Sequence, residues 1–319
     1  MSQTNQTSIT EIVLLGFEGP VNIRVIMFIL LFVIYMGSLG GNSLIILLVS
    51  LSQRLHSPMY FFLCHLSVTD IIISSSVVPN MMYFSLQGRG IISFSNCLTQ
   101  LFFFGMAIGV ECLILTVMSY DRYLAICRPL HYNSIMGLRL QSLLVTFSWL
   151  VGFSAPFIIA CSIPTLDFCG PNIINRFFCD TGCFLELSCS DTFLINSELL
   201  LTGYPMTVIA FMFIIVTYVN IFRMIFGSSI TIGRQRAFST CSSHLTVVCA
   251  YYGSLIINYM IPIKGDTIII NKYLSLLYTV MTPLFNPIIY TLRNKEIRLA
   301  FNYYLQRSTD YCRSLLGSS

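Results

Sequence analysis

The sequence predicts an all-α membrane protein, a bundle of seven transmembrane helices followed by a short amphipathic C-terminal helix. Of its 319 residues, 55% are hydrophobic and only 9% are charged, and the mean hydropathy is +0.79. Soluble domains carry about 25% charged residues. Apolar segments long enough to cross a hydrocarbon core of about 30 Å lie at about 25–51, 58–84, 97–127, 141–163, 199–226, 238–262 and 272–292.

Basic residues near the span ends predict the orientation in the membrane. The side with the loops after spans one, three and five and the C-terminus holds Arg54, Arg122, Arg128, Arg139, Arg223, Arg234, Arg236, Arg293, Lys295, Arg298, Arg307 and Arg313. The other side holds Arg24, Arg89, Arg176, Lys264 and Lys272. Twelve basic residues against five, out of 17 in all, predict an extracellular N-terminus and a cytoplasmic C-terminus; we expect a multi-pass protein of the plasma membrane.

The chain shows no internal repeat, so we expect one domain. It divides into an extracellular N-terminus (1–24), seven spans (25–292) and a cytoplasmic helix and tail (293–319). Residues 1–22 are polar, so no cleavable signal peptide is expected. Asn5-Gln6-Thr7 is a glycosylation sequon on the predicted outer side, or a chance match. Apolar residues at 297, 301, 304 and 305 beside basic residues predict a short amphipathic helix on the inner membrane surface, with a disordered tail as the alternative.

The longest link between spans, 164–198, is rich in cysteine and acidic residues. It contains four of the twelve cysteines, at positions 169, 179, 183 and 189. Because this loop is predicted to lie outside the cell, where disulfides form and persist, we expect it to be folded and stapled.

Two carboxyl groups lie well inside predicted spans, Asp70 in span two and Glu111 in span three. Charges within a bilayer are costly and call for partners. If both face the interior with Asn42 and Asn286, they share a proton or hold a cation such as sodium, because two buried like charges cannot both stay ionised unpaired. The alternative is a polar knot that only satisfies buried hydrogen bonds.

Proline residues recur at the span centres, namely Pro156, Pro205, Pro262, Pro283 and Pro287. They permit kinks and movement but also occur in static bundles.

The Asp121-Arg122 step places a permanently charged guanidinium at the predicted inner end of span three. Arg122 either pairs with Asp121 in one state and with other partners in another, or only sets the topology.

Four long motifs follow one another in a fixed order. They are PMYFFL at 58–63, MSYDRYLAIC at 118–127, AFSTCSSHL at 237–245 and PLFNPIIYTLRN at 283–294. Together with Asn42, Asp70, Cys97, Trp149 and Tyr218, they make the chain resemble the olfactory (odorant) receptor family of rhodopsin-like (class A) G-protein-coupled receptors. The resemblance covers essentially the whole chain. Ser119 stands where the family usually has alanine, and arginines 234 and 236 flank Gln235 where lysine is commoner.

The resemblance implies an odorant receptor that is not an enzyme. No cofactor is expected, apart from the sodium ion that Asp70 and Glu111 could hold. Its partners would be a small-molecule odorant, a stimulatory olfactory-type G protein that raises cyclic AMP, and the lipid membrane, with no nucleic acid. It also implies disulfides Cys97–Cys179 and Cys169–Cys189, and leaves open whether Cys161 and Cys183 form a third. The residues implied in activation and G-protein coupling are Asp121, Arg122, Tyr123, Tyr218, Arg236, His244, Asn286, Pro287 and Tyr290.

Position along the spans predicts a ligand pocket between the outer halves of spans three, five, six and seven. Its expected lining is Phe104, Gly105, Ile108, Gly109, Thr202, Met206, Tyr252, Leu255, Tyr259, Leu276 and Thr279. This is an apolar lining with a few hydroxyls, suited to a small, mostly neutral organic ligand; for each residue the alternative is ordinary helix packing. Phe104 stands where similar amine receptors carry aspartate, and Tyr252 where many receptors carry tryptophan.

Two other function classes fit the sequence less well than a receptor. A transporter or channel could use Asp70 and Glu111, but no inverted repeat or continuous polar face accompanies them. An intramembrane enzyme needs a nucleophile and a base within reach of each other, and the embedded carboxyls and His244 lie too far apart along their spans.

Overall fold

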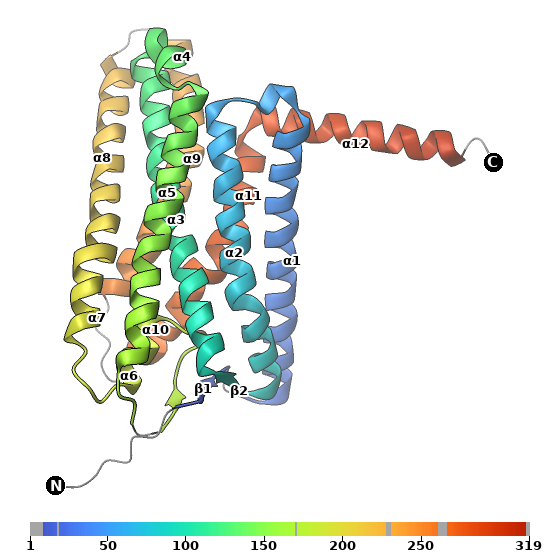
Figure 1. The fold of residues 1–319 in the computed structure, drawn as a ribbon. Coiled ribbons are helices and arrows are strands. Elements are labelled where there is room, and N and C mark those ends of the chain that lie inside the picture. Colours follow the sequence, from blue (N-terminus) through green and yellow to red (C-terminus); the bar gives the residue numbers. More distant parts are fainter. Residues whose placement is uncertain (1–8, 18, 170, 228–230, 261–266, 317–319) are drawn as a thin grey trace, which may run out of the picture.

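Seven helical segments lie side by side in the computed structural model (Figure 1). The structure describes residues 9–17, 19–169, 171–227, 231–260 and 267–316, and their side chains except at 231–240, 257–260, 267–271, 308 and 310–316. The segments are α1 (Val21–Leu51), α2 (Pro58–Gln87), α3 (Phe94–Cys127), α5 (Leu138–Ser162), α7–η4–α8 (Phe193–Glu198, Leu199–Gly203, Tyr204–Gly227), α9 (Thr231–Met260) and α10–η5–α11 (Thr267–Leu276, Leu277–Met281, Thr282–Arg293). The seven predicted spans are confirmed, with ends shifted by a few residues.

The short elements lie at the two ends of the bundle, which we name the Cys97 end and the Arg122 end after residues of α3. At the Arg122 end are η1 (Gln53–Leu55), η2 (Pro129–His131) and α4 (Tyr132–Ile135). At the Cys97 end are β1 (Glu11–Leu15), β2 (Arg89–Ser93), η3 (Ile163–Thr165), β3 (Ile173–Ile174) and α6 (Thr181–Leu187). The long loop is therefore folded, as its cysteines predicted.

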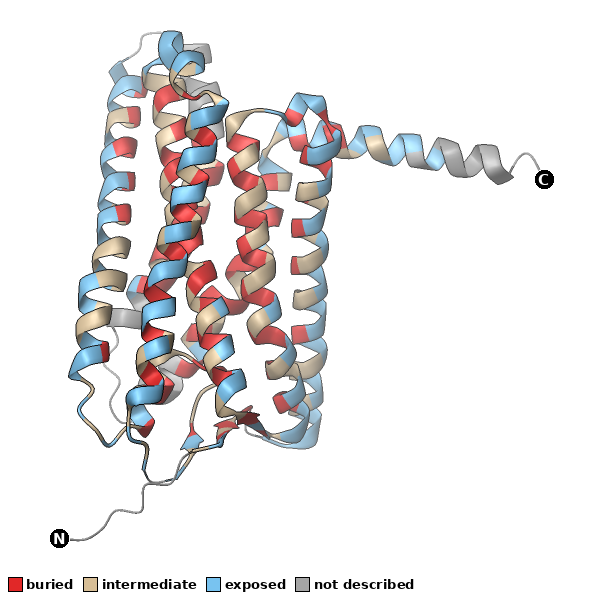
Figure 2. Ribbon diagram, in the orientation of Figure 1, coloured by how far each residue is buried: buried red, intermediate tan, exposed pale blue. Residues whose placement is uncertain are grey.

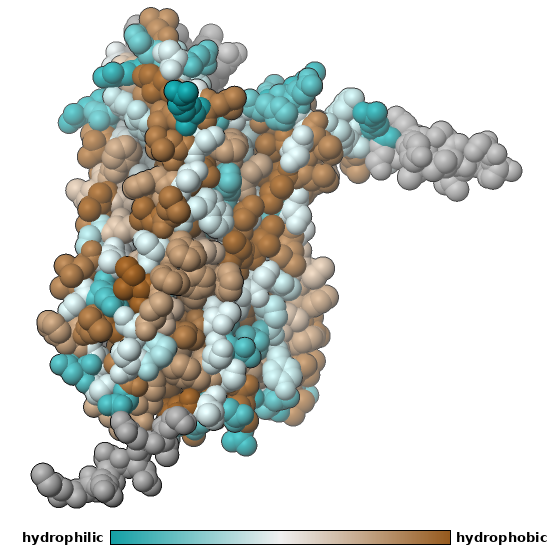
Figure 3. Space-filling model, in the orientation of Figure 1, coloured by the Kyte–Doolittle hydropathy of each residue, from teal (hydrophilic) through white to brown (hydrophobic). Residues whose placement is uncertain are grey.

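The outward faces of the bundle are apolar, as lipid contact requires. Val33, Leu150 and Ile209 are 60–68% exposed, and Figure 2 shows the buried residues concentrated on the inward faces. Hydrophobic residues cover much of the length of the bundle in Figure 3. Among the described helices, five are long and apolar enough to cross a membrane, namely those spanning 21–51, 58–87, 94–127, 138–165 and 193–227.

The last helix, α12 (Lys295–Leu316), turns away from the bundle and projects to one side at the Arg122 end (Figure 1). Its first turns are anchored by buried Ile297 and Ala300 and by a hydrogen bond from the Tyr304 hydroxyl to the Leu51 carbonyl, 2.7 Å. The predicted C-terminal helix is present, but at 22 residues it is longer than the short helix expected.

Two π-helical turns each precede a proline in the sequence. η4 ends two residues before Pro205 and η5 two residues before Pro283. Proline has no N–H to donate to the carbonyl four residues earlier and its ring collides with that carbonyl. A widened turn accommodates the missing bond, so these prolines alter α8 and α11 locally without breaking the spans.

α3 and α5 approach each other closely at a pair of glycines. A Cβ on Gly152 of α5 would lie 2.7 Å from the Val110 backbone nitrogen, and one on Gly109 of α3 would lie 3.2 Å from the Gly152 Cα. No side chain fits between the two backbones at this level.

The N-terminal segment adds a strand that sequence reasoning did not anticipate. β1 pairs antiparallel with β2 and parallel with β3, which gives the order β2-β1-β3. Ile12 and Leu14 of β1 are fully buried against the loop residues around Cys179. The small sheet covers part of the Cys97 end of the bundle.

Candidate functional site

A polar centre lies in the middle of the bundle, where α2, α3 and α11 meet. Asp70 and Glu111 are fully buried. The amide nitrogen of Asn286 donates to both oxygens of Asp70, at 3.0 and 3.1 Å, and contacts the Glu111 Oε1 at 3.2 Å. The structure thus brings together three of the residues predicted to meet.

Asn42, the fourth residue expected there, has a different role. Its amide nitrogen donates to the carbonyls of Ser38, 3.0 Å, and Pro283, 2.9 Å. Pro287 cannot donate to the Pro283 carbonyl as an ordinary helical residue would, and the Ser38 hydroxyl also donates to it, 3.2 Å. Side chains of α1 therefore satisfy the backbone group that the proline leaves free.

The carboxylate oxygens of the polar centre are suitable ligands for one hard cation, or acceptors for one proton. Three carboxylate oxygens contact one amide group, and the fourth, the Glu111 Oε2, is buried without a hydrogen-bond partner. Oxygen atoms are the ligands that hard cations prefer. The described residues hold no group of three or more His, Cys, Asp or Glu side chains that would suit a more demanding metal.

An ion pair between neighbouring residues lies near the end of α3, at the Arg122 end of the bundle. The Arg122 guanidinium donates to the fully buried Asp121 carboxylate, and the Tyr132 hydroxyl of α4 donates to the same carboxylate at 2.7 Å. Burial and the adjacent Asp121 charge raise the pKa of the Tyr132 phenol, so it stays protonated and able to donate. Arg122 is therefore paired within its own helix, as one of the two interpretations expected, while Tyr123 is half-buried beside it.

A histidine joins three helices close to this ion pair. The His244 Nε2 of α9 lies 3.2 Å from the Leu115 carbonyl of α3, and its Nδ1 lies 2.7 Å from the Tyr218 hydroxyl of α8. Since a carbonyl can only accept, Nε2 carries the proton and Nδ1 accepts from Tyr218. His244 is fully buried, so this chain of bonds holds α9 against α3 and α8.

The remaining residues implied in activation surround these contacts. Tyr290 is fully buried and its hydroxyl has no hydrogen-bond partner in the described part of the chain. Arg293 of α11 reaches α9, where it donates to the Thr246 hydroxyl at 3.2 Å. The Arg236 side chain lies outside the described residues.

The predicted pocket residues on α3 divide into two groups. Phe104 is buried and contacts the rings of Phe178, 5.0 Å between centroids, and Tyr278, 6.2 Å. Gly105 and Gly109 lie against α5, since a Cβ on either would come within 3.2 Å of Pro156 or Gly152. The two glycines therefore serve helix packing, the alternative interpretation of these positions.

On the other helices, the predicted polar groups already have partners. The Tyr252 hydroxyl lies 3.1 Å from the Cys112 sulfur, and Thr202 and Thr279 bond to carbonyls one turn earlier in their own helices. Ile108, Met206 and Leu276 are half-buried and Leu255 is buried. The side chain of Tyr259 lies outside the described residues.

Two disulfides stabilise the long loop: one joins it to α3 and the other lies within it. Cys97 bridges to Cys179 and Cys169 to Cys189, the pairs that the sequence resemblance implies. Cys161 and Cys183 are both free; Cys161 is exposed, whereas Cys183 is buried with its thiol 3.4 Å from the Phe178 carbonyl. No third bridge joins them. Cys179 places Phe178 directly over Phe104, so the loop packs on the predicted pocket.

Lys272 of α10 is a buried lysine that sequence reasoning used only as a topology marker. Its ammonium donates to the carbonyls of Leu15, 2.7 Å, and Gly16, 2.9 Å, and to the Asn175 side-chain oxygen, 2.7 Å. It also lies 4.6 Å from the centre of the Phe177 ring. One side chain thus ties α10 to the N-terminal strand and the long loop.

We expect Lys272→Met to lower the free energy of unfolding by about 3 kcal/mol, because it leaves buried oxygens without their charged donor. The N-terminal strand should also become more accessible to protease. Thermal unfolding and limited proteolysis of the purified full chain measure both effects. Lys295→Met, which removes an exposed lysine, is the control, and equal stability of the two variants would contradict the assigned role.

The fold and these contacts define a seven-helix, multi-pass membrane protein with a polar centre between its helices and an ion pair at its Arg122 end. A family model of olfactory receptors matches residues 31–307. The chain is 45% identical to human olfactory receptor 11A1 over 302 residues, 95% of this chain and 96% of that one. It is 43% identical to human olfactory receptor 13A1 over 297 residues (93% and 90%) and 40% identical to mouse olfactory receptor 5G29 over 310 residues (96% and 98%).

The chain belongs to the olfactory receptor family of G-protein-coupled receptors, which are not enzymes.

Proposed function

We propose that this odorant receptor binds a small, mostly apolar organic ligand in the Cys97 half of the bundle. The observation that supports this most directly is the aromatic group formed by Phe104, Phe178 and Tyr278 beneath the disulfide-linked loop. It joins α3, the loop and the last span in the Cys97 half of the bundle. Aromatic walls with few free polar groups suit a neutral ligand.

The proposed response is opening of the Arg122 end. A ligand produces it only by binding the open state more tightly than the closed one. Opening would break the His244 bonds to α3 and α8 and release Arg122 from Asp121. The freed guanidinium and the basic loops would then engage a stimulatory, olfactory-type G protein, and cyclic AMP would rise.

We place the Cys97 end outside the cell and the Arg122 end in the cytoplasm of a plasma-membrane receptor with one domain. The distribution of lysine and arginine supports this orientation, and so does the cysteine-rich Cys97 end, since disulfides persist outside the cell. Asn5 would then be available for glycosylation; it lies outside the described residues. α12 would lie along the inner lipid surface.

We further propose that Asp70 and Glu111 hold one positive charge between them, either a proton or a sodium ion. Asn286 and the two carboxylates would be the holding groups. A bound cation would supply neutralising charge that stabilises the closed arrangement of α2, α3 and α11.

The test is a cyclic AMP reporter in cells that display the full chain at their surface, exposed to a chemically diverse odorant panel. We expect at least one compound to raise cyclic AMP in a saturable manner, with no response in cells that lack the receptor. Silence of a well-displayed receptor across a broad panel would count against the proposal. A response with calcium but without cyclic AMP would retain the receptor and overturn the proposed G protein.

A further inference from the structure

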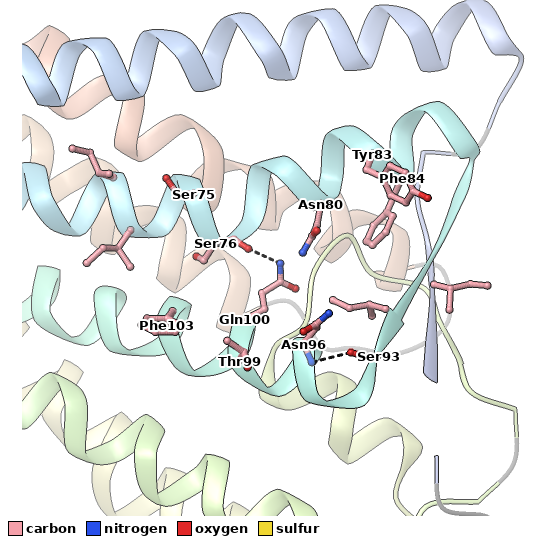
Figure 4. Close-up of a pocket in the computed structure, with 14 residues that line it drawn as sticks. Ser75, Ser76, Asn80, Tyr83, Phe84, Ser93, Asn96, Thr99, Gln100 and Phe103 are labelled. Atoms are coloured by element: carbon pink, nitrogen blue, oxygen red, sulfur yellow. Dashed lines mark hydrogen bonds between the residues drawn. The ribbon is translucent and has the colours of Figure 1, made fainter. Parts of the chain in front are cut away.

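A groove of about 640 Å³ lies between α2 and α3 in the Cys97 half, next to β2 (Figure 4). Its volume falls in the range of about 300–1,000 Å³ typical of small-molecule sites. None of the residues predicted to line the odorant pocket lines it. Several of its walls, including Ser75, Tyr83 and Phe103, are exposed on the outward surface, so the groove opens toward lipid and not into the bundle.

The groove extends along α2 from Ile71 to Phe84. The thirteen steps between these residues, at about 1.5 Å each, give a length of about 20 Å. One leaflet occupies about half of the 30 Å hydrocarbon core. An occupant of the groove would therefore span about one leaflet and reach the interface at the Cys97 end.

The lining changes in character along this length. Ile71 and Ile72 are the lining residues of α2 furthest from the Cys97 end, by their place in the helix. Asn80 and Asn96 lie toward the Cys97 end, whereas Phe103 lies at the deeper end (Figure 4). In Figure 3, pale and teal residues interrupt the brown surface in the half of the bundle that holds this end. No charged side chain lines the groove.

The two asparagines have unused hydrogen-bonding capacity. Within the described part of the chain, the side-chain amides of Asn80 and Asn96 have no hydrogen-bond partner. Gln100, on the groove floor, is by contrast used at both ends: it donates to the Ser76 carbonyl, 2.7 Å, and accepts from the Cys179 backbone, 2.8 Å. Asn96 is exposed and Asn80 is half-buried, so both amides are free to bond to a polar group of an occupant at this end of the groove.

We propose that this groove binds a sterol, with its hydroxyl at Asn80 and Asn96 and its ring system along Ile71, Ile72 and Phe103. One hydroxyl both donates and accepts, which matches a carboxamide. A rigid ring system loses little conformational freedom on binding. Sterols are abundant in plasma membranes.

Other membrane occupants fit the groove less well. A phosphate headgroup seeks arginine or lysine, and the lining offers neither. A second copy of the chain needs about 800 Å² of complementary surface on each partner, whereas the feature here is a narrow groove between two helices. The proposal depends only on the membrane location of the chain and stands apart from its response to odorants.

The experiment uses the full chain in nanodiscs and a photoreactive cholesterol analogue, with the labelled peptides identified by mass spectrometry. We expect labelling of α2 and α3 that excess cholesterol suppresses. The epimer with the inverted 3-hydroxyl should compete about fivefold less well, the effect of roughly one hydrogen bond.

Two variants locate the site. Thr99→Trp fills the groove and should reduce labelling at least about tenfold, while Asn80→Leu should weaken it about fivefold. Ser154→Trp on α5 is the matched control, because Thr99 and Ser154 are both exposed and both bond to their own helix backbone. Labelling that Thr99→Trp leaves unchanged, or equal competition by both epimers, would overturn the proposal. So would stronger labelling of the groove by a photoreactive phospholipid than by the sterol.

Discussion

Arg122→Ala should abolish the agonist-driven cyclic AMP response while the receptor still reaches the cell surface. In the closed structure the guanidinium is held by Asp121, which Tyr132 also contacts. The proposed open state makes this group available to the G protein, so its removal takes away an interaction that forms only on activation. We expect the agonist response to fall to background, at least about tenfold, as measured by a reporter normalised to surface receptor.

Two further variants make this test specific. Arg122→Lys keeps the charge but loses the planar fork of donors, so it should retain a partial response. Arg89→Ala removes an exposed arginine of β2 at the Cys97 end, far from the proposed G-protein surface, and should respond normally. A full response from surface-expressed Arg122→Ala would show that Arg122 only sets the topology.

Asn286→Leu should lower the free energy of unfolding by about 3 kcal/mol, because it removes the donor between two fully buried carboxylates. Glu111→Gln should be tolerated far better, since it removes one of the two like charges and preserves the shape. In the double variant, the leucine should therefore cost less than it does alone. Thermal unfolding of the purified chain measures these differences. Asn220→Leu, which removes a carboxamide bonded only to its own helix, is the control.

The same measurements distinguish sodium from a proton. If the pair holds sodium, replacing sodium by a large organic cation at constant ionic strength lowers the thermal stability of the wild type. Glu111→Gln should then lose this dependence. If the pair holds a proton, stability is insensitive to sodium and falls as the pH is raised far enough to remove that proton. Insensitivity to both would leave a polar knot that only satisfies hydrogen bonds.

The sequence predicted the spans and the polar centre because a bilayer imposes simple demands. Only helices and closed barrels satisfy their backbone in lipid, and runs of about 20 apolar residues indicate helices. An embedded carboxylate such as Asp70 must find a partner. Asn42 could not be assigned in this way. It contacts a carbonyl that exists as a free acceptor only because Pro287 follows it in the helix, and that relation depends on how α1 packs on α11.

Other features depend on contacts that no single stretch of sequence contains. Gly105 and Gly109 lie in the helix where they were expected, but on the face of α3 that is turned toward α5. That orientation follows from the close fit with Gly152 and Pro156. The strand β1 pairs with segments far away in sequence. Lys272 could have been recognised as unusual, since it stands at the start of an apolar span. Two of its three acceptors, however, are backbone carbonyls, which any residue has and which the sequence therefore does not reveal.

The contact between Gly109 and Gly152 determines which parts of the bundle can move. Two backbones that nearly touch cannot slide past each other without a collision, and the centre at Asn286 fastens α2 and α11 to the same helix. We therefore expect α3 to keep its position relative to α2, α5 and α11, which contact it near its middle. Within the described part of α9, hydrogen bonds of His244 and Arg293 join it to α3, α8 and α11 near the Arg122 end. These bonds can break and form again, so α9 is the helix that we expect to move.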